Sequence, residues 1–224
     1  MLLSHKLRQG YADMLERRLS KSSLRNIIAH NVTFEIYMER YAEQFTEWVQ
    51  GMVIKFSPAA LIHIKISQFF IELFRIYLKR VSVAQLFSAP FVMRLKPGKQ
   101  GREPDICLVL NERASIILDT MLDGPADVVI EIVSPESVDR DLVEKYDEYE
   151  SYGVREYWVI NPVRKQTDFY VLGDDKLYHR IELVNGVFHS SVLPQFHLST
   201  NRLWDISFLD DSDNARDLVD AMLT

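Results

Sequence analysis

A carboxylate stands in the middle of a strongly apolar run: Glu131 lies within "VVIEIV", residues 128–133. A buried carboxylate without a partner costs several kcal/mol, or its pKa shifts until the group is neutral. Glu131 therefore either has a partner or lies at the exposed end of its strand. Asp105 follows Pro104 at the start of a second apolar run, "ICLVL". If the two strands are neighbours, their carboxylates converge and repel, and a divalent cation would cancel that repulsion. Because Mg²⁺ and Mn²⁺ prefer oxygen ligands, the pair indicates a metal site.

Lys145 is the basic residue that the pattern places nearest to this site. It belongs to a helix predicted between Ser134-Pro135 and Gly153. At about 100° per residue, Lys145 lies roughly 60° from the centre of the apolar stripe, on the flank of the helix. Its stem can bring the ammonium near Glu131, and its truncation should open no core cavity. A solvated pair with Asp141, one turn earlier, is the competing explanation.

The periodicity of apolar residues predicts the elements that position these side chains. A strand, a helix and a strand follow one another over residues 126–160, which implies a right-handed parallel crossover, whereas the other strands alternate as in antiparallel pairs. The fold class is therefore α/β, with a mixed central sheet and helices on its faces. The predicted helices cover residues 3–20, 33–43, 59–80, 134–153 and 213–223, and the predicted strands lie within 45–56 (a hairpin turning at Gln50-Gly51), 84–95, 103–110, 126–133, 155–161, 167–172, 177–183 and 186–193.

Composition excludes several classes of protein. With 224 residues, 47% of them apolar and 26% charged, the chain is typical of a globular domain with a sizeable core. Its single cysteine, Cys107, excludes an internal disulfide and a zinc site of paired cysteines, and it indicates a reducing, cytoplasmic location. No apolar run approaches the ~18 residues of a membrane span. The net charge of −6 argues against non-specific binding of nucleic acid by the whole surface.

A longer ordered pattern carries a family resemblance. The segments "EPDICLV", "DVVIEIVSPES" and "RDLVEKYDEYESYGVREYWVINP" resemble the Uma-type (Uma-two) restriction endonuclease family. The segments "TFEIYMERY", "TEWVQGMVI" and "LPQFHLSTNRLWD" extend the resemblance from about Thr33 to the C-terminus. It implies a PD-(D/E)xK nuclease-like domain over residues 31–224, with a restriction-endonuclease-like mixed sheet flanked by helices. Residues 1–30 would then be an N-terminal helical extension.

The resemblance also implies site residues. Asp105 and Glu131 would hold Mg²⁺ or Mn²⁺, together with the backbone carbonyl of Ile132. In the wider fold a lysine stands two residues after the glutamate, but here that position is Val133. Lys145 matches the place of a lysine moved onto the following helix, where it would orient water or offset developing charge.

Two further matches to the family pattern concern residues far from the central motif. Glu47 matches an acidic position in the opening hairpin, and His63 matches a polar position at the start of the long helix. The alternatives are an exposed charged strand residue for Glu47 and a polar helix-start residue for His63. Cys107 and the tyrosines of the motif helix are expected to pack in the core.

The resemblance implies a Mg²⁺-dependent endodeoxyribonuclease that hydrolyses DNA phosphodiester bonds. We expect a homodimer, because one small site on an acidic subunit would grip a duplex poorly and two-fold assembly is the commonest way to pair sites. Two other functions remain open from the sequence. One is a catalytically idle nucleic-acid-binding relative, and the other is an interaction module that uses the fold as a scaffold.

Overall fold

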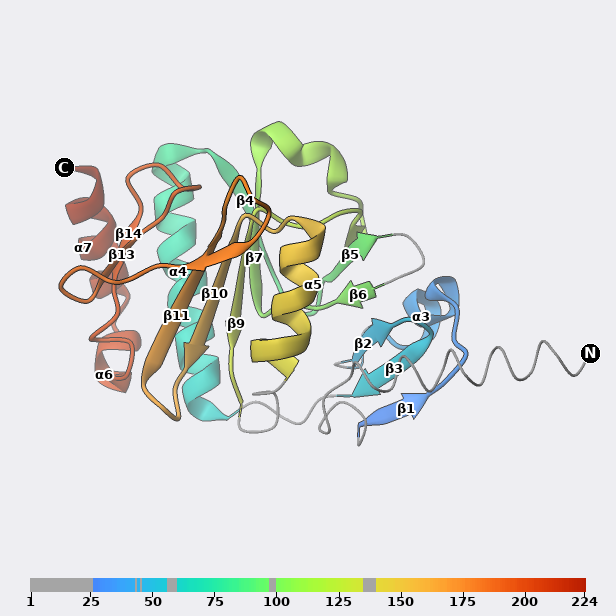
Figure 1. The fold of residues 1–224 in the computed structure, drawn as a ribbon. Helices are drawn as coiled ribbons and strands as arrows, with labels where there is room; N and C mark the ends of the chain where they lie inside the picture. Colours follow the sequence, from blue (N-terminus) through green and yellow to red (C-terminus); the bar gives the residue numbers. More distant parts are fainter. Residues whose placement is uncertain (1–25, 43, 45, 56–59, 97–99, 135–139) are drawn as a thin grey trace, which may run out of the picture.

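Two six-stranded β-sheets, a two-stranded one and the helices that cover them make up the described part of the chain, as Figure 1 shows for this computed structural model. The structure describes residues 26–42, 44, 46–55, 60–96, 100–134 and 140–224. The helix expected over residues 3–20 lies outside them, and the domain boundary at residue 30 stays a prediction. In the described part, no helix is both long and apolar enough to cross a membrane.

The larger part of the core lies around a six-stranded sheet, here called the central sheet. Its order is β12 (Tyr178–Arg180), β11 (Gln166–Leu172), β10 (Glu156–Asn161), β9 (Val128–Ile132), β7 (Ile106–Leu110) and β4 (Ala84–Ser88). The β9 and β10 strands run parallel, while the other neighbours run antiparallel. The sheet is therefore mixed, and the predicted α/β class and parallel crossover are confirmed.

A second six-stranded sheet, the side sheet, lies beside the central one in Figure 1. Its order is β1 (Ile27–Ala29), β3 (Met52–Lys55), β2 (Thr46–Val49), β6 (Gln100–Arg102), β5 (Val92–Lys96) and β8 (Met121–Leu122). The apolar run of residues 84–95, predicted as one strand, is divided at Ala89-Pro90 between the two sheets, with β4 in the central sheet and β5 in the side sheet. The hairpin at Gln50-Gly51 is confirmed as β2 and β3.

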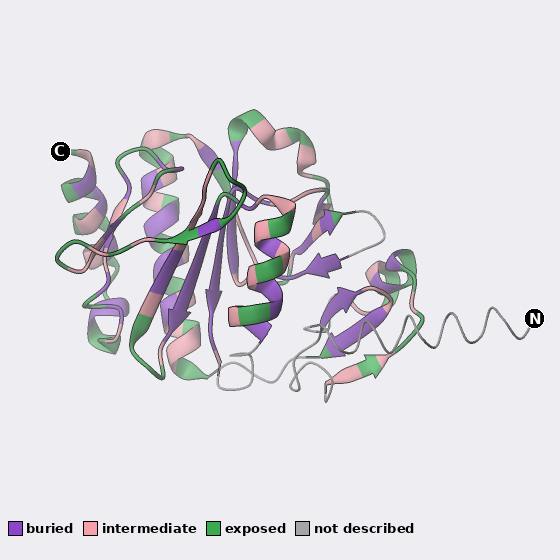
Figure 2. Cartoon of the chain, viewed as in Figure 1, coloured by how far each residue is buried: buried purple, intermediate pink, exposed green. Residues whose placement is uncertain are grey.

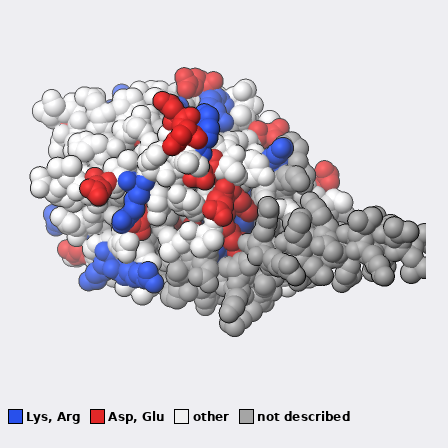
Figure 3. All heavy atoms as spheres, in the orientation of Figure 1, with Lys and Arg blue, Asp and Glu red and all other residues white. Residues whose placement is uncertain are grey.

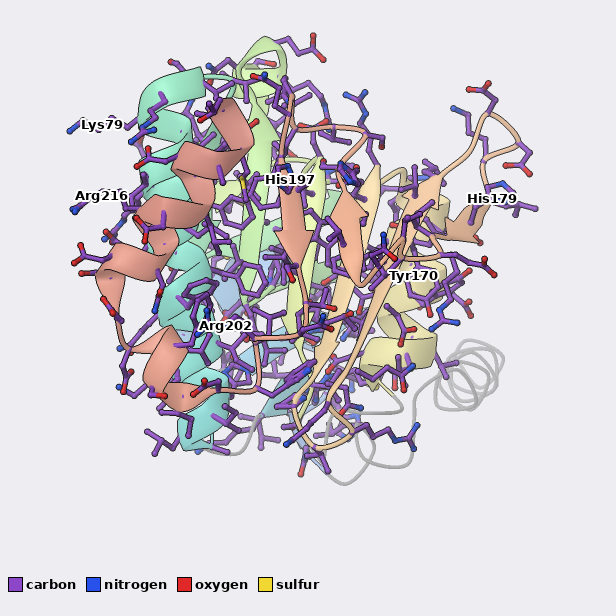
Figure 4. The ribbon with its side chains drawn as sticks, turned by 90° about the vertical axis from the view of Figure 1, so that its left-hand side faces the viewer. Lys79, Tyr170, His179, His197, Arg202 and Arg216 are labelled. Atoms are coloured by element: carbon purple, nitrogen blue, oxygen red, sulfur yellow. The ribbon has the colours of Figure 1, made fainter. Side chains whose placement is uncertain are left out.

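Helices cover the two faces of the central sheet and one region of the side sheet. Their bounds are α3 (Phe34–Arg40), α4 (Leu61–Val81), α5 (Lys145–Tyr152), α6 (Ile206–Leu209) and α7 (Ser212–Leu223), with a 3₁₀ turn, η1 (Asn111–Ile116), and a π-type turn, η2 (Arg140–Glu144), directly before α5. A small hairpin of β13 (Val187–His189) and β14 (His197–Ser199) lies beside α4 and α7 in Figure 4. The β14 strand was not predicted.

The α4 helix forms because its apolar residues recur at helical spacing, and its C-terminal end is capped. Its buried face presents Ile66, Phe69, Phe70, Leu73, Phe74 and Tyr77 to the central sheet. Burial of each such side chain contributes about 1.5–3 kcal/mol. Ser82 ends the helix in the left-handed conformation (φ 51°), and Lys79 and Arg80 complement the partial negative charge of its last turn.

The alternation of side chains along β9 separates two cores. Ile130 and Ile132 face α4 and pack in the cluster of Trp158, whereas Val129 and Val133 face α5. Glu131 shares the α5 face, as its position in the strand requires. Figure 2 shows the inner strands of the central sheet, β7, β9 and β10, as buried. The partners of the Glu131 carboxylate must therefore lie on the face of the central sheet that α5 covers.

A second buried carboxylate, at the start of β10, holds a distant loop. Glu156 has no exposed surface, and its oxygens accept hydrogen bonds from the backbone N–H groups of Ser191 (2.6 Å) and Val192 (3.0 Å). The hydroxyls of Ser190 and Ser191 (2.8–3.1 Å) and the indole N–H of Trp158 (3.0 Å) also donate to it. Among the described residues no cation pairs with Glu156, so neutral donors compensate the buried charge.

We expect Glu156→Ala to lower the free energy of unfolding by at least about 3 kcal/mol, because it strands several buried donors at once. Glu156→Gln should also destabilise, since its amide NH₂ would face donors. The control is Glu182→Ala, an exposed glutamate that should change stability by no more than about 0.5 kcal/mol. Urea unfolding followed by tryptophan fluorescence gives these values, and equal stability of the Glu156 and Glu182 variants would contradict this account.

Candidate active site

Lys145 lies at the centre of a buried cluster of carboxylates. Its ammonium Nζ is 2.9 Å from Glu131 Oε1, 3.0 Å from Glu47 Oε1 and 3.4 Å from Asp141 Oδ1. Glu47 comes from β2 of the side sheet, Glu131 from β9 of the central sheet and Asp141 from η2. The residue expected from the sequence to sit on a helix flank is 2% exposed. That expectation was wrong, because the side sheet covers this side of the helix and supplies Glu47.

Asp105 forms the accessible end of the site. The antiparallel register pairs Ile106 with Ile130, so one step further along the strands Asp105 lies level with Glu131. Its Oδ2 accepts a hydrogen bond from the backbone N–H of Ile132 (2.7 Å) and lies 3.1 Å from His63 Nε2. The Asp105 side chain keeps 22% of its surface exposed, against 4% for Glu131. A ligand from solvent therefore meets Asp105 first.

Arg102 joins the same cluster from β6 and was not singled out by sequence reasoning. It is fully buried and makes a two-pronged contact with Glu148, from Nε to Oε2 (2.8 Å) and from Nη2 to Oε1 (2.9 Å). Its Nη1 donates to Glu47 Oε2 (2.6 Å), and Nη2 lies 3.5 Å from Glu144. Arg102 and Lys145 thus share Glu47, and this shared carboxylate connects the side sheet to α5.

The electrostatics of the cluster follow from burial and from the ratio of acids to bases. Burial raises the pKa of Glu131 to about 8, against the opposing charge of Lys145, and the charges of Asp105 and Asp141 add to the rise. Burial alone would lower the pKa of Lys145, but the surrounding carboxylates outweigh it and raise that pKa. Burial would likewise raise the pKa of Glu47, yet Lys145 and Arg102 lower it to about 2.

His63 is held by the same exposed carboxylate. Burial would lower the pKa of the imidazole, but the hydrogen bond and charge of Asp105 outweigh burial and raise it. His63 belongs to the first turn of α4, so its contact with Asp105 connects the start of that helix to the start of β7.

The structure brings together all the residues singled out from the sequence. Asp105, Glu131, Lys145 and Glu47 form one contact chain, and His63 closes it at the exposed end. Val133, the position of the lysine in the wider fold, is buried among apolar side chains. The sequence missed Arg102, Glu144 and Glu148, together with Tyr149, whose hydroxyl donates to Glu131 Oε1 at 2.8 Å. Only the spacing of Glu144 and Glu148, one helical turn apart, hinted at a shared partner.

Cys107 and the tyrosines behave as expected of core residues. Cys107 is 2% exposed and burial raises the pKa of its thiol, which excludes a reactive thiolate. Tyr149 and Tyr157 are fully buried and pack edge to face, with ring centroids 5.0 Å apart. Neither of them can serve as an exposed stacking platform.

The donor set of the exposed end fits a hard divalent cation. Asp105, Glu131 and the carbonyl of Ile132 would supply oxygen ligands only. Two further buried oxygens nearby, Glu47 Oε1 and Asp141 Oδ1, accept no hydrogen bond, although both lie within ion-pair distance of Lys145. In the described residues, no three His, Cys, Asp or Glu side chains are arranged around a common metal position, so this set depends on a backbone ligand.

Comparisons with known proteins agree with the fold. The model of the Uma2 family, described as "Putative restriction endonuclease", matches residues 33–201. A solved structure described as a putative nuclease belonging to DUF820, from Anabaena variabilis ATCC 29413, is similar with a TM-score of 0.64 and 17% sequence identity. The match covers 78% of this chain and 98% of that one. No curated protein matches the chain. The predicted family and restriction-endonuclease-like fold are confirmed.

We expect Arg102→Ala to destabilise the fold by about 3–5 kcal/mol, because it leaves buried carboxylates without their cation. Arg102→Lys should recover only part of that loss, since an ammonium cannot make the two-pronged contact with Glu148. Arg216→Ala removes a solvent-exposed pair with Asp213 and should cost less than about 1 kcal/mol. Urea denaturation of the three variants measures these differences. A loss at Arg102 no larger than at Arg216 would mean that the buried cluster does not stabilise the fold.

Proposed function

The chain belongs to the Uma2 family, and from that premise we propose that it is a metal-dependent endonuclease that hydrolyses phosphodiester bonds of DNA. The observation that carries the proposal is the placing of Asp105. Its carboxylate is fixed by the Ile132 N–H, is partly exposed, and lies level with the buried Glu131 of the neighbouring strand. The function in turn accounts for the burial of Glu131, because a strand carboxylate that must hold a cation has to keep a fixed position.

Each residue of the site has a distinct part in this proposal. A bound Mg²⁺ or Mn²⁺ would polarise the phosphate and lower the pKa of an attacking water. Asp105, Glu131 and the Ile132 carbonyl would hold the ion. His63 orients Asp105 through their contact of 3.1 Å, and the hydrogen bond and charge of Asp105 raise the pKa of its imidazole.

Lys145 acts through Glu131 in the arrangement seen. Three carboxylates at 2.9–3.4 Å surround its ammonium, and its side chain is 3% exposed. The family resemblance implied that this lysine orients water or offsets developing charge, but here its hydrogen-bonding capacity is directed at protein carboxylates. We therefore assign Lys145 as a positioning residue that fixes the Glu131 oxygen and keeps negative charge from accumulating behind the metal.

The same burial favours one alternative. A lysine with three carboxylates, all at most 4% exposed, is also what a purely structural cluster would contain. A catalytically idle relative that binds nucleic acid, or a scaffold, would keep the cluster for stability and have no use for the exposed Asp105. The nuclease and the idle or scaffold protein therefore differ in whether they need Asp105, whereas both would keep Lys145.

The chain is further proposed to act in the cytoplasm as a homodimer. The acidic net charge of −6 leaves one subunit poorly suited to hold a duplex alone, and two-fold pairing of sites would correct this. Multi-angle light scattering at micromolar concentration should give about twice the 26.2 kDa of the chain. A mass of a single chain at that concentration would overturn the dimer.

Asp105→Asn tests the function. We expect Mn²⁺-dependent nicking of supercoiled plasmid to fall at least about 100-fold, because the variant loses a charged ligand, while the fold survives at this partly exposed position. Asp119→Asn, an exposed aspartate, is the matched control and should nick as the wild type does. Equal nicking by the Asp105 and Asp119 variants would exclude the proposed site.

Lys145→Met tests the assignment of Lys145 as a positioning residue. It should both abolish nicking and lower the free energy of unfolding by about 3–5 kcal/mol, so activity has to be measured where denaturation curves show the variant folded. A wild type that nicks no DNA in Mg²⁺ or Mn²⁺ would favour the idle relative.

A further inference from the structure

The tight turn between β10 and β11 carries two exposed cations, Arg164 and Lys165. The β10–β11 turn consists of Pro162, Val163, Arg164 and Lys165, and the Asn161–Gln166 strand pair closes it. Arg164 and Lys165 are exposed, and Val163 at the tip keeps 69% of its surface exposed. Packing therefore does not explain the residues of this turn.

The turn has a defined shape. The Asn161 side-chain oxygen accepts a hydrogen bond from the backbone N–H of Arg164 (3.0 Å), in the manner of an Asx turn. Lys165 adopts the left-handed conformation with φ 50°, which brings the chain back into β11. A fixed backbone limits the entropy that the two long side chains lose when they bind a ligand.

The turn lies at the same end of the central sheet as Asp105. The backbone N–H of Ile132 donates to Asp105, and the next N–H, that of Val133, donates to the Ile160 carbonyl (2.8 Å) two residues before the turn. The β7, β9 and β10 strands are consecutive neighbours in the sheet, so the end of β10 is two strand spacings, or about 10 Å, from the start of the antiparallel β7, where Asp105 lies. Since phosphates of one DNA strand repeat every ~3.4 Å along the helix axis, this offset corresponds to about three phosphates.

The two cations are available for a ligand, unlike most of the basic residues around them. Neither Arg164 nor Lys165 forms an ion pair with a described residue, whereas Lys65 at the start of α4 pairs with Asp210 at 2.6 Å and Arg180 on β12 pairs with Asp168. In Figure 3, Lys and Arg side chains gather along the lower edge of the face shown, where Figure 1 places the turn between β10 and β11. The site beside them is acidic and would by itself repel a phosphate backbone.

We propose that the β10–β11 turn is a backbone clamp for duplex DNA, in which Arg164 and Lys165 bind phosphates next to the one that is cleaved. The inference rests on the nuclease function proposed above and adds the contact that holds the substrate against an acidic site. Arg164 can bind one phosphate through two parallel hydrogen bonds, and Lys165 supplies a point charge. Such contacts position a duplex without reading its sequence.

The test uses a double variant, Arg164→Gln with Lys165→Gln, which removes both charges and keeps side-chain length. The matched control is Lys79→Gln with Lys176→Gln. Both control lysines are exposed, and Lys176 has the same left-handed backbone as Lys165 (φ 65°). They lie toward the opposite end of the sheet, since Lys176 follows the far end of β11 and Lys79 lies in the last turn of α4, where Figure 4 labels it.

Binding of a fluorescein-labelled 30-base-pair duplex is followed by anisotropy in EDTA between 50 and 200 mM KCl, and plasmid nicking is followed in Mn²⁺. For the clamp variant we expect affinity at 100 mM KCl to fall about 10-fold, and the slope of log K against log salt to become shallower by up to about 1.8, or 0.9 for each lost phosphate contact. Nicking should fall in parallel at subsaturating DNA. The control should stay within about twofold of the wild type in all three measurements.

The possible results distinguish a failure of the proposed clamp from a failure of the proposed nuclease function. If the wild type binds and nicks DNA while the clamp variant matches the control, the clamp is wrong and the nuclease function stands. An equal loss in both variants would also overturn the clamp, because it would show a general effect of charge. A wild type that neither binds the duplex at 50 mM KCl nor nicks plasmid would overturn the nuclease function, and the clamp with it.

Discussion

The buried ammonium of Lys145, shared by carboxylates from three elements, is the interaction on which the arrangement of the site depends. Glu47 belongs to the side sheet, Glu131 to the central sheet and Asp141 to the turn before α5. None of these acids could remain charged in the core alone, because desolvation of an unpaired carboxylate costs more than the fold can supply. Their common cation therefore fixes the two sheets and the helix relative to one another, and Arg102 repeats the pattern by sharing Glu47.

The position of this cluster decides where chemistry can occur. Glu131 and Lys145 are almost wholly covered, and Asp105 with His63 forms the part that solvent reaches. The backbone N–H of Ile132 links the buried and the accessible part, because Ile132 directly follows Glu131 and its N–H donates to the Asp105 carboxylate. A rigid interior that supports a single accessible carboxylate is what precise placing of a metal ion requires. The neighbouring β10–β11 turn carries exposed positive charge, whereas Lys145 and Arg102 of the site are buried.

Buried charge also organises the part of the fold that is remote from the site. Glu156 collects the backbone and side-chain donors of residues 190–192 at the start of β10, and Trp158 contributes its indole N–H. The loop before β14 is thereby tied to the middle of the central sheet, on the face opposite to Glu131. The two acids thus lie on adjacent parallel strands and face different cores, one compensated by cations and the other by neutral donors.

The sequence by itself determined the α/β class, the parallel crossover from β9 to β10, the long α4 helix and the family, because these follow from local periodicity and from an ordered run of motifs. It also identified Asp105, Glu131, Lys145, Glu47 and His63, whose types and order match the family pattern. Only the tertiary structure decided that the strands divide into two sheets and that Lys145 is buried. Both depend on contacts between segments far apart in the chain, as Glu47 and Lys145 are, and periodicity describes only which face of an element is apolar. For the same reason, periodicity did not identify Arg102 and Glu156, because the partner of a charged residue in a strand is known only once the chain is folded.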